Sequence, residues 1–397
     1  MHERYSTQYF HTLTGTPLPL DAPAEMAGFT RYWGNLGLFV PYEYGNLTGP
    51  QFGFVAGRSE TGFWITGRGS NKIDQPLWSH VSEVDFKQRT LTVHNNKASL
   101  NAPLAARIFG ARPDIRYIVH FHFPLPSAFA LPHDTAPGTL EDAIICDALP
   151  HNIFYQPHHG SLVLLHSLEE WIPLLLRESV YQAGAHNYNR AYARFLQQNR
   201  FSKFVRTQAR QGAKAIGDIG CGTGESTRSL LLLSPQVTLI EPSAVMLAEA
   251  CKTHPQLKHQ NASASTFTGE FDLLVMRQAF NYILPNQYGA TFRHIFQHLA
   301  SGGSFIFNTF SPLQPDQALK VRHDQDNNGG HTAEGSLLEG DQIHHLQTLV
   351  SPQGNVMDYN QFFNTNVDLI RQQLEAAGFS VQLEQESNSL YFSCTRN

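Results

Sequence analysis

A glycine-rich loop carries the residues whose spacing most clearly indicates chemistry. Gly220, Gly222 and Gly224 follow Asp218 at the end of a short predicted strand, and Glu241 ends the next predicted strand about twenty residues later. Glycines let the backbone turn tightly and approach a ligand without side-chain obstruction. The helix that follows would direct free N–H groups at that ligand, and a carboxylate like Glu241 can accept hydrogen bonds from both hydroxyls of a ribose. The pattern therefore predicts a loop that binds a ligand carrying a ribose.

Histidines form a second group, because many of the twenty in the chain gather between His120 and His166. His120 and His122 alternate along one predicted strand, which puts both imidazoles on one face about 7 Å apart. With His159 as a third ligand they would form a three-histidine site with room for water or substrate. Neutral imidazole binds zinc and related ions well, so the pattern predicts a divalent-metal site, with zinc as the first expectation. The other interpretation is that these histidines are strand residues facing a polar interior.

The first half of the chain must position the histidines. Gly, Asn and Pro interrupt apolar runs over residues 28–110, which predicts short strands joined by turns. A helix is expected over residues 102–109, ending at Gly110. Alternation predicts a strand over residues 115–123 that carries the paired histidines, and helical spacing with acidic residues in the first turn predicts a helix over residues 167–181.

The second half must position the glycine loop. After a helix predicted over residues 189–210, strands and helices alternate, which implies crossover connections and a parallel sheet with helices on both faces. The glycine loop joins the first strand of this series to a helix predicted over residues 225–233. We expect a loop or lid over residues 311–330 and a hairpin over residues 341–363.

Length and composition favour two globular domains. A single core tends to divide beyond roughly 250–300 residues, and this chain has 397, of which 41% are hydrophobic. A small polar stretch at residues 183–187 marks the junction, so we predict domains over residues 1–184 and 185–397. The net charge is −5, only 15% of residues are charged, and no basic run is present. A duplex-binding surface needs many phosphate contacts, so we expect no nucleic-acid partner.

The remaining features point to the cytoplasm. The four cysteines form no CxxC pair, which fits a reducing compartment. The first residues are polar and lack the apolar stretch of a signal peptide. Charged residues and a proline interrupt the most hydrophobic run, residues 161–176, so we expect no membrane-spanning segment.

Over residues 185–397 the chain resembles class I S-adenosylmethionine (SAM) dependent methyltransferases. The string DIGCGTG, residues 218–224, is more similar to their cofactor loop than to the G-x-G-x-x-G of nicotinamide enzymes, and residues 271–275 resemble their fourth strand. The resemblance implies SAM as cofactor and a Rossmann-like, mostly parallel seven-stranded sheet. It assigns cofactor contacts to eight residues, which are Asp218, Gly220, Gly222, Gly224, Glu241, Asn261, Arg277 and Tyr188. A glycine turn that binds another ligand, and a SAM domain that does not transfer methyl groups, stay open as alternatives.

Over residues 25–180 the chain resembles class II aldolases and the adducin-like fold that they share. The run ARPDIRYIVHFHFP, residues 111–124, carries the resemblance, together with GNLT at 45–48, ITGRG at 65–69 and HHG at 158–160. It implies a three-layer αβα domain, so the whole chain is expected to be α/β. It also implies that His120, His122 and His159 bind the metal and that relatives commonly assemble into homo-oligomers through this domain. Contacts to a phosphate or other anion are assigned to Asn46, Thr66, Gly69 and Ser99, with Arg68 and Lys72 nearby.

The chain departs from the aldolase pattern at two points. Nineteen residues before the first metal histidine the family has a glutamate or aspartate that acts as base, and here Asn101 stands there. A neutral amide cannot accept a proton at working pH. His159 follows His122 by only 37 positions, fewer than is typical of the family. A base could come from elsewhere, for example from His133, His151 or His158, or the domain could be a non-catalytic scaffold that holds subunits together.

The sequence as a whole predicts a bifunctional enzyme that acts on small molecules. The C-terminal domain would transfer a methyl group from SAM, and the N-terminal domain would act on a carbonyl or sugar-derived intermediate. The alternatives are a methyltransferase joined to a scaffold and a SAM-binding regulator without turnover. No residue is assigned a catalytic role, because spacing does not select among the possible proton acceptors His331, His344, His345 and Tyr359.

Overall fold

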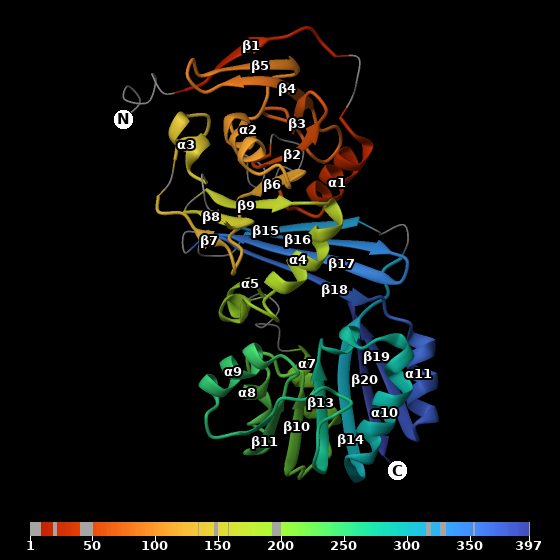
Figure 1. Ribbon diagram of the computed structural model, residues 1–397. Coiled ribbons are helices and arrows are strands. Elements are labelled where there is room, and N and C mark those ends of the chain that lie inside the picture. Colours follow the sequence, from red (N-terminus) through yellow and green to blue (C-terminus); the bar gives the residue numbers. More distant parts are fainter. Residues whose placement is uncertain are drawn as a thin grey trace. The chain divides into compact units, whose positions relative to one another are not determined.

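The structure is a computed structural model of the 397-residue chain. It describes residues 9–18, 22–39, 51–133, 135–146, 150–157, 159–192, 200–314, 319–325, 331–351 and 354–396. The chain forms two compact units (Figure 1). The N-terminal unit consists of Met1–Glu178, Val321–Gly335 and Leu346–Asp358, and the C-terminal unit of Ser179–Lys320, Ser336–His345 and Tyr359–Asn397.

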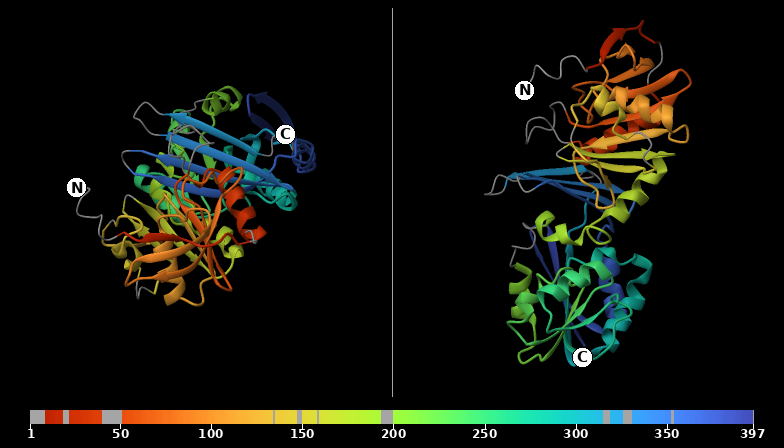
Figure 2. Two further views of the ribbon diagram at one scale, coloured as in Figure 1. Left: turned by 90° about the horizontal axis from the view of Figure 1, so that it is seen from above. Right: turned by 60° about the vertical axis from the view of Figure 1, so that its left-hand side comes forward.

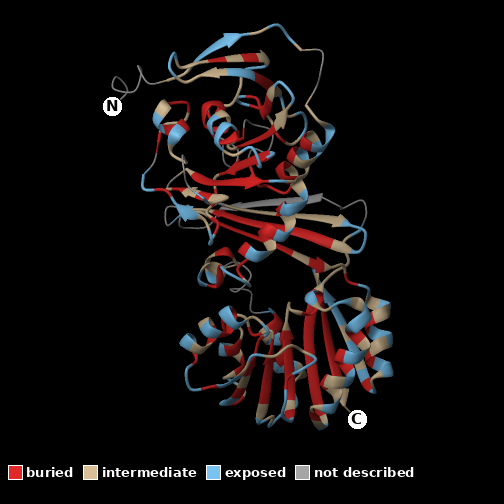
Figure 3. Ribbon diagram, in the orientation of Figure 1, coloured by how far each residue is buried: buried red, intermediate tan, exposed pale blue. Residues whose placement is uncertain are grey.

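A nine-stranded mixed sheet forms the centre of the N-terminal unit. Its strand order is β1 (His11–Thr14), β5 (Thr90–Asn95), β4 (Trp78–Asp85), β3 (Gly62–Thr66), β2 (Phe54–Ser59), β6 (Tyr117–Phe121), β9 (Gly160–Leu165), β8 (Ile153–Gln156) and β7 (Phe129–Ala130). The two outermost pairs, β1 with β5 and β7 with β8, are parallel, and the other neighbours are antiparallel. The central strands β6 and β9 are buried along their whole length (Figure 3).

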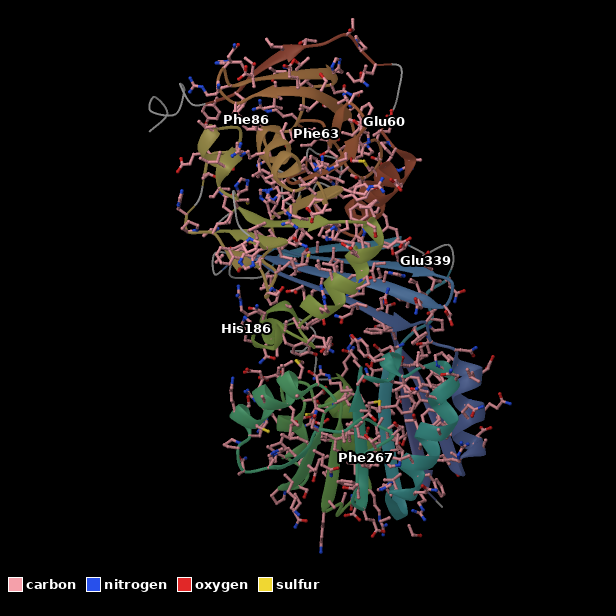
Figure 4. All side chains as sticks on the ribbon, viewed as in Figure 1. Glu60, Phe63, Phe86, His186, Phe267 and Glu339 are labelled. Atoms are coloured by element: carbon pink, nitrogen blue, oxygen red, sulfur yellow. The ribbon has the colours of Figure 1, made fainter. Side chains whose placement is uncertain are left out.

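Helices cover both faces of this sheet, so the predicted three-layer αβα arrangement is confirmed. Helix α2 (Ala102–Ala111) lies beside α3 (Leu140–Ile144) and packs on the face that carries Phe54 and Ile118. The ring centroid of Phe63 on β3, labelled in Figure 4, lies 5.4 Å from that of Phe109 on α2. On the other face, α1 (Ala24–Asn35) meets α4 (Trp171–Glu178), where the Trp171 ring contacts Phe29 and Phe121.

Helix α1 corrects the prediction of strands and turns for residues 28–110. Its buried side chains Met26, Thr30 and Trp33 recur at helical spacing and face the sheet. Gly28 and Gly34 obscure that pattern in the sequence, because glycine is a turn signal and a poor helix former. Gly34 is required here, since a Cβ at this position would lie 2.6 Å from the carbonyl oxygen of Lys72.

The seven-stranded sheet of the C-terminal unit is mostly parallel, as predicted. Its strand order is β12 (Lys258–Gln260), β11 (Gln236–Ile240), β10 (Ala215–Ile219), β13 (Phe271–Arg277), β14 (Leu299–Phe310), β20 (Ser389–Arg396) and β19 (Phe379–Glu386). The first five strands are parallel and the last two are antiparallel to their neighbours. Residues 273–276 of β13 form a continuous apolar run, as expected where helices cover both faces of a strand (Figures 1 and 2).

Two apolar cores lie on the two faces of this sheet. One packs α10 (Tyr288–Gln297) and α11 (Val367–Ala376) on Leu274 and Phe307, and Phe267 belongs to the same core (Figure 4). The other packs α7 (Arg200–Gln208) and α9 (Ala244–Thr253) on Leu273 and Ile306.

The short elements and the helix lengths refine the predictions. Helix α8 covers only Thr227–Leu230, less than the predicted 225–233. The predicted helix 189–210 is found as α5 (Tyr188–Ala191) and α7, and its residues 193–199 lie outside the described part of the chain. The 3₁₀ turns are η1 (Leu168–Glu170), η2 (Ala185–Asn187), η3 (Phe280–Tyr282) and η4 (Pro285–Gln287). No described helix has both the length and the apolar character that crossing a bilayer requires.

A separate four-stranded sheet has the order β15 (Leu319–Gln325), β16 (His331–Glu339), β17 (Gln342–Val350) and β18 (Val356–Phe363). The neighbours β17 and β18 match the predicted hairpin 341–363. The prediction of a loop over 311–330 is wrong at β15. The sequence of this strand is mostly polar, which favoured a loop. Its backbone groups are paired with those of β16, and such pairing does not depend on the side chains.

Candidate functional site

The glycine loop of the C-terminal unit adopts a backbone that requires glycine. Gly220, Gly222 and Gly224 have φ angles of +67°, +57° and +83°, in the left-handed region that other residues rarely occupy. A Cβ on Gly220 would lie 2.5 Å from the Cβ of Ala279, and one on Gly224 would lie 2.8 Å from the ring of His254. The loop therefore leaves bare backbone at the carboxyl end of β10.

Asp218 lies in β10 just before this loop and is fully buried. Its Oδ2 accepts hydrogen bonds from the hydroxyls of Thr227, at 2.6 Å, and Ser226, at 3.4 Å. Its Oδ1 has no partner among the described residues. Burial raises the pKa of this carboxyl to about 6. A buried acceptor without a donor is costly, so Oδ1 marks a place where a ligand donor fits.

Glu241 follows β11 and lies against the same loop. Its Oε2 accepts from the backbone N–H of Gly222 at 2.9 Å, and its Oε1 from that of Ser243 at 3.0 Å. Burial raises the pKa of this carboxyl. Each oxygen keeps a further lone pair for a ligand hydroxyl. Asn261 donates from Nδ2 to the carbonyl oxygens of Glu241 and Pro242, at 2.9 Å each, so the structure brings it to this edge of the sheet.

Tyr188 and Arg277 complete the predicted set of cofactor residues. Tyr188 on α5 faces the loop, with its Cε1 4.0 Å from where a Cβ of Gly222 would stand. Burial lowers the pKa of Arg277, and electrostatic interactions with Tyr188 and Asp218 act in the opposite direction. The guanidinium of Arg277 therefore lies near both of these side chains. All eight residues therefore gather at the carboxyl ends of neighbouring parallel strands, where α/β sheets bind ligands. The bare loop, the orphaned Asp218 oxygen and the Glu241 carboxylate fit SAM.

The sequence did not single out Tyr181, which adds to this edge. Its ring centroid lies 5.8 Å from that of Tyr188 and 5.4 Å from that of Tyr282, and its carbonyl accepts a hydrogen bond from the Ser243 hydroxyl. Tyr192 lies 5.0 Å from Tyr188, ring to ring. No motif identifies the contacts of Tyr181 with Tyr282 and Ser243, because those residues lie far from it in the sequence.

The three predicted histidines of the N-terminal unit form one cluster. Their ring centroids are 5.1 Å apart for His120 and His122, 5.0 Å for His120 and His159, and 5.3 Å for His122 and His159. Each offers one nitrogen, and these nitrogens lie within 4.8 Å of one another. A spacing of this size needs only a small contraction to bind one ion.

The protonation of the cluster suits a metal. Nδ1 of His120 donates to the carbonyl oxygen of Ser161 at 2.9 Å, and its buried Nε2 has no partner among the described residues. Such a backbone bond fixes the tautomer with Nε2 as the free ligand atom. Burial and the neighbouring His159 lower the pKa of His122 to about 3, and burial lowers that of His120 well below its usual value. Both imidazoles are therefore neutral, the form that binds metal ions, and the donor set fits zinc.

The predicted anion contacts are only partly brought together. The turn after Thr66 pairs with the chain near Ser99, through a hydrogen bond from the Arg68 N–H to the Lys97 carbonyl at 2.8 Å. Thr66 is buried and its hydroxyl accepts from the Val55 N–H at 3.3 Å. Gly69, with φ +69°, has open space at its Cβ position. Asn46 lies outside the described residues.

Asn101, which stands at the position of the family's base, caps helix α2 and is buried. Its side chain contacts Asp142 on α3, whose carboxyl also accepts from the Thr135 hydroxyl at 2.7 Å and has a pKa raised to about 6 by burial. Of the other suggested bases, His133 pairs with Glu141 at 3.0 Å on the surface and His151 stacks on Phe129. His158 lies outside the described residues.

The suggested proton acceptors of the second half lie on the four-stranded sheet. Nδ1 of His344 lies 2.7 Å from the hydroxyl of Tyr359, and Nδ1 of His345 lies 3.0 Å from that of Ser336. The side chain of His331 is outside the described set. The geometry does not select one of them as catalytic.

Lys72 differs most from its predicted setting. The resemblance predicts it near a bound phosphate or other anion, but only 1% of its surface is exposed. Burial lowers the pKa of its amine to about 7. No signal in the sequence marks it as buried, because the flanking run GSNKI reads as a turn.

Two family models match the chain. Residues 185–384 match the methyltransferase domain, and residues 25–171 match the class II aldolase and adducin N-terminal domain.

Curated relatives match only a part of the chain. It is 36% identical to trans-aconitate 2-methyltransferase of Deinococcus radiodurans over 91 residues, 22% of this chain and 34% of that protein. It is 31% identical to malonyl-[acyl-carrier protein] O-methyltransferase of a Paenibacillus species over 110 residues, 24% of this chain and 39% of that protein. The chain thus spans little more than a third of the length of each. A SAM-dependent methyltransferase structure from Clostridium acetobutylicum aligns with 53% of this chain and 97% of its own, at 17% identity and a TM-score of 0.46.

Proposed function

Because the chain belongs to the methyltransferase domain family and also carries a class II aldolase and adducin N-terminal domain, we propose that it is a bifunctional enzyme acting on small molecules. Its C-terminal unit transfers a methyl group from SAM to a small acceptor. Its N-terminal unit binds a divalent metal, with zinc as the first choice, and acts on a carbonyl or sugar-derived intermediate. The observation that carries the first part is the convergence of the orphaned Asp218 oxygen, the Glu241 carboxylate and the left-handed glycine loop at one edge of the parallel sheet.

SAM supplies an activated methyl group, and the residues of this chain bind and orient the reactants. Asp218 Oδ1 would accept a hydrogen bond from the amino group of the cofactor, and Glu241 would accept from the ribose hydroxyls. The bare backbone at Gly220 and Gly222 would leave room for the amino-acid portion, next to Tyr188. Methyl transfer is an in-line displacement in which positioning can supply most of the rate enhancement. No side chain is assigned as the base that takes the acceptor's proton.

The test of this part is turnover by the intact chain. Pools of small metabolites are incubated with SAM, and S-adenosylhomocysteine (SAH) is quantified by mass spectrometry. We expect SAH to accumulate with some pool and not without an acceptor, and the Asp218→Ala variant to lose this activity. SAM binding without SAH from any pool would instead favour a regulator.

In the N-terminal unit, His120, His122 and His159 would hold the metal, which would supply a Lewis acid for a carbonyl substrate. The free and buried Nε2 of His120 supports this proposal. Metal content of the purified chain tests it. We expect about one equivalent in the wild type, loss of the metal in the His120→Ala, His122→Ala double variant, and no loss in His133→Ala, a variant of an exposed histidine in the same unit.

A non-catalytic scaffold is the second candidate for this unit, and Asn101 favours it, since an amide cannot replace the family's acidic base. Absence of metal from the wild-type chain would support the scaffold. In either case we propose that the aldolase-like domain forms a homo-oligomer, as its relatives commonly do.

We propose a cytoplasmic protein with small-molecule substrates and no nucleic-acid or membrane partner. The support is the net charge of −5 without a basic run, together with four cysteines that form no CxxC pair in the sequence.

A further inference from the structure

The N-terminal unit buries the amine of Lys72, and no counter-charge for it is found among the described residues. Lys72 Nζ donates to the carbonyl oxygen of Gln51 at 2.6 Å and lies 5.4 Å from the centre of the Phe39 ring. No carboxylate among the described residues pairs with it, and burial is the one cause that lowers its pKa. An unpaired buried charge is costly and is retained mainly where it has a use.

The segment that holds this amine also packs on the histidine cluster. Gln51, which binds Lys72, is followed by Phe52, whose ring stacks on that of His122 with centroids 4.8 Å apart. Phe54 lies 5.4 Å from His120, ring to ring. A Cβ on Gly53 would lie 2.3 Å from the carbonyl oxygen of His120, so only glycine permits the two strands to approach this closely.

Electrostatics agree with this proximity. The charge of Lys72 contributes to lowering the pKa of both His120 and His122. A divalent ion at the cluster would therefore experience the same positive charge, and a bare ion beside an ammonium group is repelled.

The hydrogen-bonding groups at this place also lack an acceptor. Nε2 of Gln51 is buried and has no partner among the described residues. The amine of Lys72 has three protons, and one described oxygen accepts from it. The N–H groups of Gln51 and Lys72 that have no acceptor among the described residues could donate to a ligand with a negatively charged oxygen.

We propose that the three-histidine site binds its metal together with an anionic ligand, and that Lys72 is the positioning residue whose positive charge couples the two. The inference rests on the proposed metal site and adds the class of substrate. That substrate presents an ionised oxygen to the site, as a carboxylate or an ionised hydroxyl next to a carbonyl does. Metal and anion then each raise the affinity of the chain for the other, because coupling between two ligands is reciprocal.

The experiment measures Co²⁺ binding to the metal-free full chain at pH 6, one unit below the pKa of Lys72, by absorption spectroscopy. Each titration is done alone, with sodium azide as anionic probe, and with pyridine, which is mostly uncharged at this pH, as neutral probe. Lys72→Gln removes the charge and keeps an N–H donor for the Gln51 carbonyl. Lys87→Gln makes the same change at an exposed lysine of the same unit.

In the wild type we expect azide to raise the Co²⁺ affinity about tenfold, within the usual range of such coupling, and pyridine to raise it less. Lys72→Gln should bind Co²⁺ alone more tightly than the wild type and should lose most of the azide effect. Lys87→Gln should behave as the wild type does. A purely structural role of Lys72 would weaken binding under all conditions instead.

Equal azide effects in the wild type and Lys72→Gln would overturn the proposal while leaving the metal site intact. Absence of stoichiometric Co²⁺ binding in the wild type would refute the metal site and this inference with it. If Lys72→Gln does not fold, as circular dichroism would show, the wild type alone decides, because equal effects of azide and pyridine contradict an anion-selective site.

Discussion

Replacement of Asp218 by Asn should have opposite effects on stability and on cofactor affinity. Burial raises the pKa of this carboxyl from 3.8 to about 6, so folding disfavours its ionised form. Between these two values the folded chain binds more protons than the unfolded chain, and the free energy of unfolding therefore falls as the pH rises. Two units correspond to roughly 3 kcal/mol. Without ligand, Asp218→Asn should be more stable than the wild type at pH 7 by up to that amount, and the difference should vanish near pH 4.

Cofactor affinity should change in the other direction. If the cofactor's amino group requires the ionised carboxylate, the wild type should bind SAH about tenfold more weakly at pH 5 than at pH 7, since the ionised fraction of Asp218 falls from about nine tenths to one tenth. Asp218→Asn should bind weakly at both. Glu241 also has a raised pKa and titrates in both proteins, so the ratio between the two proteins is the informative quantity.

Urea unfolding and calorimetry with SAH over pH 4–7 provide both measurements. An affinity ratio that does not change with pH would refute the role given to Asp218 Oδ1. A ligand-free variant less stable than the wild type at pH 7 would refute the account of its burial.

Three further predictions concern single side chains. Glu241→Gln should weaken SAH binding at least tenfold, about 1.4 kcal/mol, because an amide cannot accept from both backbone N–H donors that this carboxylate meets. Calorimetry checks this with Glu270→Gln, a change at an exposed glutamate, as control. Equal SAH affinities of the two variants would contradict the prediction. Gly220→Ala should lower the free energy of unfolding by roughly 1–3 kcal/mol, because the backbone is left-handed and the new Cβ would lie 2.5 Å from that of Ala279. Urea unfolding should show a smaller decrease for Gly212→Ala, where φ is +82° but the space around the Cβ is open. Equal decreases would exclude the contact with Ala279 as the cause. The pKa of Lys72 is lowered from 10.5 to about 7, so the free energy of unfolding of the wild type should rise with pH above 7 more than that of Lys72→Gln; parallel pH profiles would show that the amine is not buried as described.

The glycine loop could be predicted from sequence because its chemistry is local. Asp218 and the three glycines lie within seven residues, and left-handed backbone excludes other residue types. The position of Glu241 at the end of the next strand could also be predicted, because strand–helix–strand units have a regular length. The sequence could therefore predict which residues meet at this edge of the sheet, whereas the position of Tyr181 depends on its packing against Tyr282, about a hundred residues away.

The N-terminal unit shows where such prediction ends. Alternation places His120 and His122 on one face of a strand, but only the register of β6 with β9 brings His159 to them. The burial of Lys72 depends on Gln51 and Phe39, two segments that no motif relates to it. Helix α1 was missed because local turn signals opposed a helix that packing against the sheet stabilises.

Calorimetric titration of SAH into the intact wild-type chain at pH 7 tests the central claim most directly. The account predicts one site per chain with a dissociation constant of about 100 µM or tighter, within the usual range for enzyme ligands. Absence of binding by both SAH and SAM to the folded chain would contradict it.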